Sequence, residues 1–142
     1  MRDIAKQINR VIFALLLPCL AMSCIGDDDI NEIFREQDWK LTYIKEGSVQ
    51  RYTKEKIYSI NFQERTFTAT TPSGATITGN WQANGDESHS FVCTGIRTTG
   101  NLSGDTIGLK MREILKNARK YNGDTNWLQI KQEENIFMQF YN

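Results

Sequence analysis

The chain has 142 residues, a length that allows one small domain. Its 17 basic residues balance 17 acidic residues, so the formal charge is zero. A nucleic-acid-binding domain would favour a basic surface, and we therefore expect no nucleic-acid partner.

The first 23 residues predict a secretion signal. Arg2, Lys6 and Arg10 make the start basic, and residues 11–22 form an apolar run of twelve residues without a charge. A basic segment followed by a short apolar segment is typical of a signal peptide. A membrane-spanning helix needs about 20 apolar residues, and Pro18 would interrupt its hydrogen bonding.

The end of this signal, LAMSC at residues 20–24, resembles the bacterial lipobox. The resemblance implies cleavage before Cys24 and attachment of lipid to Cys24, which would anchor the protein in a membrane. The alternative is an ordinary signal peptide in which Cys24 has no special role. Removal of residues 1–23 takes away three basic residues and one acidic residue. The mature part then has 14 basic and 16 acidic residues, a formal charge of −2.

An acidic run, Asp27, Asp28 and Asp29, follows the predicted anchor. Three adjacent carboxylates repel one another, so we expect a solvated tether over residues 24–35. The run also resembles the surface-export signal of Gram-negative bacteria rich in surface lipoproteins. That resemblance implies recognition by the lipoprotein export machinery and a place on the outer face of the outer membrane. A periplasm-facing lipoprotein with a plain tether is the alternative.

Residues 36–142 are predicted to form the single folded domain. Residues 30–35 could form one helical turn, and residues 47–56 read as a loop or a frayed strand. Five segments combine alternating apolar positions with β-branched and aromatic residues, which is typical of strands. They are residues 39–44, 57–62, 66–71, 76–83 and 88–94.

A loop is expected at residues 95–104, and the pattern then changes to a helical period. Ile107, Met111, Ile114, Leu115 and Ala118 form one apolar stripe, which predicts an amphipathic helix over residues 105–121. The side chain of Asp105 can cap the helix, and Gly123 can end it. Residues 127–131 and 136–141 then predict a hairpin.

These elements predict an α+β fold, a strongly coiled antiparallel sheet or partly open barrel of about seven strands packed by one helix. The Trp-x-Leu strand at Trp39, the Gly-x-Trp strand at Gly79 and the helix LKMREILKNARKY resemble the META-domain family of bacterial envelope and heat-shock lipoproteins. A Gly-Asp hairpin with Leu-x-Ile and Phe-x-x-Phe supports the resemblance. The Gly-Cys-Asn and Met-Ala-Cys motifs of that family are absent. A small lipocalin-like module is the alternative.

Cys93 and His89 are residue types that could act as a catalytic nucleophile and its general base. Four residues along a strand span about 13 Å, which is too far for a hydrogen bond. We therefore expect Cys93 to be a small core residue that forms no intramolecular disulfide. One histidine and one cysteine do not make a usual zinc site. The acidic residues Glu87 and Glu133 are expected to lie in solvated turns. We expect no catalytic residue, metal or cofactor.

Asp105-Thr106-Ile107 resembles the acceptor motif for O-glycosylation in the same surface-lipoprotein bacteria, with Thr106 as the acceptor. Four aromatic residues fall on polar or opposite faces of their elements and are predicted to form an exposed contact surface: Tyr52, Tyr121, Phe137 and Tyr141. These features favour a non-catalytic module that binds a protein, a glycan or a small apolar ligand. The alternative is a hydrolase or other enzyme with an unrecognised site.

Overall fold

The computed structural model describes residues 29–142, so the predicted signal, Cys24, Asp27 and Asp28 lie outside the described residues. Residues 29–142 contain one short π-helix, one α-helix and nine strands. In chain order they are η1 (Asn31–Arg35), β1 (Trp39–Glu46), β2 (Val49–Tyr52), β3 (Ser59–Phe62), β4 (Thr66–Thr70), β5 (Thr76–Ala83), β6 (Phe91–Thr99), α2 (Thr106–Asn117), β7 (Lys120–Gly123), β8 (Trp127–Glu133) and β9 (Ile136–Tyr141).

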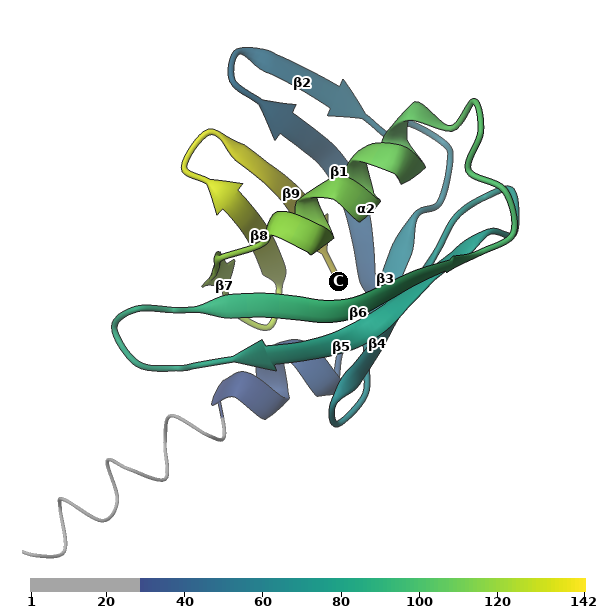
Figure 1. Ribbon diagram of the computed structural model, residues 1–142. Coiled ribbons are helices and arrows are strands. Elements are labelled where there is room, and N and C mark those ends of the chain that lie inside the picture. The colour runs from purple at the N-terminus through teal and green to yellow at the C-terminus, as the bar shows by residue number, and fades with distance from the viewer. Residues whose placement is uncertain (1–28) are drawn as a thin grey trace, which may run out of the picture.

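The nine strands form one antiparallel sheet that curls into a half-barrel around α2 (Figure 1). The strand order is β6-β5-β4-β3-β1-β9-β8-β7, and β2 pairs with the far half of β1. The outer strands of this order, β6 and β7, come together at one end of the barrel. The Phe91 N–H donates to the Arg119 carbonyl and the Tyr121 N–H donates to the His89 carbonyl, both at 2.9 Å. The predicted fold class is thereby confirmed.

Helix α2 packs against β6 and against β8, β9 and β1, and so bridges the open side of the curled sheet. Its buried side chains include Met111, Ile114 and Leu115, which belong to the predicted apolar stripe. The Asp105 carboxylate caps the helix by accepting a hydrogen bond of 2.9 Å from the Gly108 N–H.

The helix ends four residues earlier than its sequence pattern predicts, at Asn117 instead of residue 121. Ala118 is still buried, but its backbone is extended, with φ −60° and ψ 138°. The Arg119 N–H then donates to the Lys131 carbonyl, and Lys120–Gly123 pair with β8 as strand β7. The backbone hydrogen bonds offered by β8 therefore override the helical pattern in this segment.

The short helix η1 closes the end of the core at which the outer strands β6 and β7 meet. Phe34 is fully buried, and its ring centroid lies 4.9 to 5.4 Å from those of four aromatic residues. The Trp39 indole N–H also donates to the Ile33 carbonyl at 2.8 Å. Residues 31–35, which the sequence pattern groups with the tether and predicts to form at most one helical turn, form η1 and supply the core side chains Ile33 and Phe34. The folded domain begins at about residue 30.

Strand β6 extends farther than its composition indicates. Residues 95–99, predicted as loop, continue the ladder, with Arg97 opposite Thr78 and Thr99 opposite Thr76. A bulge in the register near Gly79 and a positive φ at Gly95 absorb the extra residue. Residues 88–90 precede the strand instead of starting it.

Within residues 29–142, neither helix has the length and apolar character needed to cross a bilayer.

Candidate functional site

The outward surface of β1, β2, β7, β8 and β9 carries aromatic, amide and lysine side chains. Strand alternation separates it from the interior: Met138 and Phe140 of β9 belong to the buried core, as do Leu128 and Ile130 of β8. The residues between them point the other way. We call this outward surface the lysine–aromatic face, and the strand register arranges its residues in three rows.

The first row crosses the strands near η1. Tyr141 pairs with Lys40 on one side and with Trp127 on the other. Tyr141 is 50% exposed, Lys40 is exposed and Trp127 is half-buried. This row therefore offers two accessible aromatic side chains beside one ammonium group.

The second row lies two residues farther along each strand. Tyr43 pairs with Tyr52 and with Gln139, and Gln139 pairs with Gln129. The two tyrosine rings lie 5.4 Å apart, and Tyr52 is 53% exposed. The Gln129 amide donates to the Gln139 Oε1 at 2.8 Å, which holds both amides in place.

The third row is basic. Phe137 pairs with Lys45 and with Lys131, and Lys131 pairs with Lys120. The ammonium groups of Lys45 and Lys131 lie 5.9 and 6.0 Å from the centroid of the Phe137 ring, within the range of cation–π attraction. Glu134 accepts a hydrogen bond of 2.9 Å from Lys131.

Two of the four predicted contact aromatics are not exposed. Tyr121 is 5% exposed because it lies on β7 and points inward, 5.0 Å from the Phe34 ring. Phe137 is on the outward surface but only 7% exposed, because the side chains of the third row lie over and beside it. The exposure predicted for Tyr52 and Tyr141 is confirmed.

Cys93 and His89 do not form a catalytic pair in this fold. His89 lies in the exposed loop before β6, with its ring 5.3 Å from that of Tyr121. Cys93 is half-buried against the core, and burial raises the pKa of its thiol to about 12. Among residues 29–142, no three His, Cys, Asp or Glu side chains gather in a position to hold a metal ion.

Because the thiolate is the reactive form, Cys93 should react slowly with iodoacetamide in the folded protein at pH 8. We expect alkylation of the Cys93 peptide, followed by mass spectrometry, to be at least about tenfold slower than in urea-unfolded chain. Equal rates in the two states would contradict a half-buried, unactivated Cys93.

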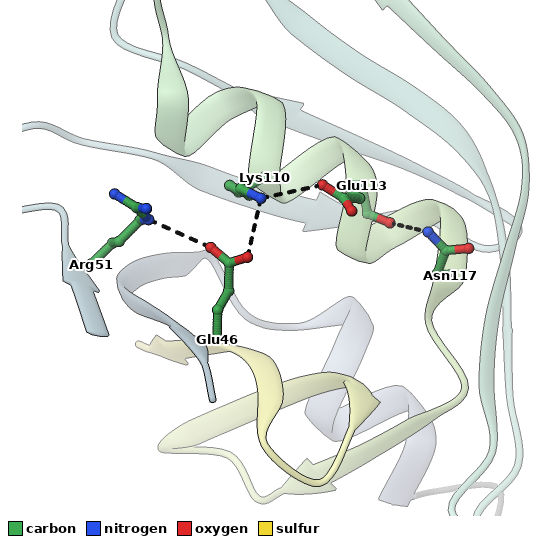
Figure 2. A network of polar contacts seen from close by, with 5 residues as sticks. All are labelled: Glu46, Arg51, Lys110, Glu113 and Asn117. Carbon is green, nitrogen blue, oxygen red and sulfur yellow. Dashed lines mark hydrogen bonds and ion pairs between the residues drawn. The ribbon is translucent and has the colours of Figure 1, made fainter. Parts of the chain in front are cut away.

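A polar cluster joins α2 to the β1–β2 hairpin (Figure 2). Glu46 contacts Lys110 at 3.1 Å and Arg51 at 3.4 Å, and Lys110 also lies 3.6 Å from Glu113. The hydrogen bond and charge of Glu46 raise the pKa of Lys110. The groups are partly solvated and each carries a charge partner, so the cluster positions the helix and offers no activated nucleophile.

Thr106 is the first residue of α2 and is exposed. Beside it, the Tyr58 hydroxyl donates to Asp105 Oδ1 at 2.7 Å, and burial together with this bond raises the pKa of Tyr58 above its ordinary value. Asp105 thus serves the helix cap and a tertiary contact at once. Glycosylation of Thr106 stays a prediction.

Comparison with known families shows which family the chain belongs to. The model of a domain of unknown function, DUF4847, matches residues 26–142. The chain belongs to the DUF4847 family. A crystal structure of a DUF4847 family protein from Bacteroides vulgatus ATCC 8482 is similar, with a TM-score of 0.61 and 22% sequence identity, over 79% of this chain and 96% of that chain. No curated protein matches.

At this identity the DUF4847 structure shows a shared fold and nothing further about function. The matched region begins at residue 26, before the first core residues of η1, which agrees with a DUF4847 domain that includes η1. The resemblance to META-domain and lipocalin-like modules stays a prediction. Sequence reasoning missed Lys40, Lys45, Trp127 and Lys131 as members of one surface, because only the strand register brings them together.

Proposed function

We propose that this protein is a lipid-anchored envelope protein whose DUF4847 domain is a non-catalytic binding module. The lysine–aromatic face is the observation that carries the binding role. Its accessible rings at Tyr52 and Tyr141 lie on the same surface as fixed amides and lysines. Exposed aromatic side chains next to polar groups are typical of recognition surfaces.

The anchor is proposed from the LAMSC sequence ending at Cys24. Six residues separate Cys24 from Asn31, where η1 begins. Even fully extended, six residues reach about 20 Å. An anchor at Cys24 would therefore hold the η1 end of the half-barrel close to the membrane and leave the strand faces open to one side.

Replacing Cys24 by alanine should abolish labelling with a clickable fatty acid and partitioning into a detergent phase. Acyl chains contribute about 0.8 kcal/mol per buried CH₂, so a protein without them has no comparable affinity for the bilayer. Cys19→Ala is the matched control, since it removes a neighbouring thiol and should leave the labelling intact. Fatty-acid labelling that survives Cys24→Ala would refute the anchor.

We further propose that Asp27, Asp28 and Asp29 direct the lipoprotein to the cell surface. In the sequence they lie between the anchor and η1, and a plain tether would work as well with Ser or Gly. Three substitutions to alanine should leave the protein lipidated and folded but protected from protease added to intact cells. Substitution by three glutamates should keep it accessible, because the acidic charge is retained. Equal cleavage of the alanine variant and the parent would mean that the three aspartates are a tether and not an export signal.

A further inference from the structure

We propose that the lysine–aromatic face binds an acidic polysaccharide. This inference rests on the proposed binding function and names its ligand class. Lys40, Lys45, Lys120 and Lys131 all belong to the outward rows of this face. Lys131 is paired with Glu134 at 2.9 Å and its side chain is only 14% exposed, so the positive charge available to a ligand comes from Lys40, Lys45 and Lys120. Without the predicted signal the chain has a formal charge of −2, so these three ammonium groups stand out as a local concentration of positive charge. A polyanion is the complementary partner.

The aromatic side chains distinguish a sugar polymer from a simple polyanion. Tyr141 and Trp127 form one cross-strand pair, and Tyr43 and Tyr52 form another. One face of a pyranose ring presents C–H groups, which pack against the negatively polarised face of an aromatic ring. Lysines and aromatic side chains in neighbouring rows of the face would bind the carboxylates and the ring faces of the same polymer.

The amides supply contacts for hydroxyl groups. Gln129 and Gln139 bond to each other at 2.8 Å, and the Gln50 Oε1 accepts a hydrogen bond of 2.7 Å from the Tyr52 hydroxyl. Amide groups held in this way present their remaining donors and acceptors at fixed positions. Within one row, residues on neighbouring strands are spaced by about 4.8 Å, close to the length of one pyranose unit in a linear polymer. The face is thus a regular array of weak contacts, and such arrays gain affinity by acting together.

The ligand is tested with the full chain purified in detergent micelles. Its migration is measured in native gels that contain polygalacturonate, chondroitin sulfate, fully methyl-esterified polygalacturonate or poly-L-glutamate. We expect retardation by polygalacturonate or by chondroitin sulfate. Stronger retardation by polygalacturonate would indicate that the face prefers carboxylate groups, and stronger retardation by chondroitin sulfate would indicate that it prefers sulfate groups. We expect much weaker retardation by the methyl ester, which has the same sugars without charge, and by poly-L-glutamate, which has the charge without sugars. The retardation should weaken as salt is raised.

Variants of exposed residues locate the site. The double variant Lys40→Gln, Lys120→Gln should lower the affinity about tenfold, because it removes two surface charge contacts. Tyr141→Ala should lower it as well. Lys56→Gln, Lys116→Gln is the matched control, since it removes two exposed lysines outside the face and should leave the affinity unchanged. Circular dichroism of each variant confirms that the fold is retained.

Three results would overturn the proposal: no retardation by either acidic polysaccharide, equal retardation by poly-L-glutamate, or an equal effect of the two double variants. None of them bears on the fatty-acid labelling of Cys24. The protein could instead bind a neutral glycan or a protein, with the same affinity in the parent and in the Tyr141→Ala variant. That result would support a binding module and would refute both the acidic polysaccharide and the lysine–aromatic face as the site.

Discussion

Replacing Ile114 by aspartate is expected to unfold the domain. Ile114 is 2% exposed and lies in the centre of the buried stripe of α2, which bridges the open side of the curled sheet. A carboxylate placed there has no partner in the apolar core, and burying it costs several kcal/mol. A domain of this size is stable by only about 5–15 kcal/mol.

Lys116→Asp is the matched control for that prediction. Lys116 lies two residues farther along the same helix and is exposed, so the new carboxylate stays in water. Its position in the last turn makes a negative charge unfavourable by less than about 1 kcal/mol. Urea denaturation followed by far-ultraviolet circular dichroism measures both variants. Similar midpoints for the two would mean that the helix packs with a different face.

Phe34→Ala should lower the free energy of unfolding by about 3–5 kcal/mol, the range for a fully buried phenylalanine. Phe34 is fully buried, and its ring contacts those of Phe62, Trp81, Phe91 and Tyr121. The substitution leaves a cavity among four large side chains that cannot all move to fill it.

Arg35→Ala is the control for this second prediction, because Arg35 is the next residue of η1 and is exposed. We expect it to change the stability by less than about 0.5 kcal/mol. Thermal and urea unfolding, read by tryptophan fluorescence, report on the region directly, since Trp81 lies 4.9 Å from Phe34. A loss below about 1 kcal/mol in Phe34→Ala would mean that η1 is an appendage and not part of the core.

The role of η1 also bears on the proposed anchor. If Cys24 carries the proposed anchor, at most residues 25–30 would separate it from the fold, because η1 packs into the core and is not a free tether.

The sequence predicted best those elements whose pattern is local. Strand β5 runs over Thr76–Ala83, as expected from its alternation of apolar and polar positions. The start of α2 follows from Asp105, whose carboxylate caps the helix as predicted. Both depend on side chains within a few residues of one another, and such interactions are visible in the order of the residues.

The errors arose where distant segments compete for the same backbone. Tyr121 continues the helical period of α2, yet its N–H bonds to the His89 carbonyl and its ring packs on Phe34. Residues 95–99 have the composition of a loop, yet they form part of strand β6 because their backbone pairs with that of β5. A backbone hydrogen bond to a remote strand outweighs a modest local preference, and the sequence does not reveal which strand will be present.

By itself, the sequence determined the curled antiparallel class and the one long helix within residues 29–142. It predicted exposure for four aromatic residues alike, and the structure decided that Tyr52 and Tyr141 are the exposed two. Only the tertiary structure decided that Tyr52 and Tyr141 share a face with Lys40, Trp127 and Lys131. That face combines residues from both ends of the domain, because β9 and β8 pair beside β1. Alternation tells which side of its own strand a residue occupies, whereas register between strands far apart in the chain decides which residues become neighbours.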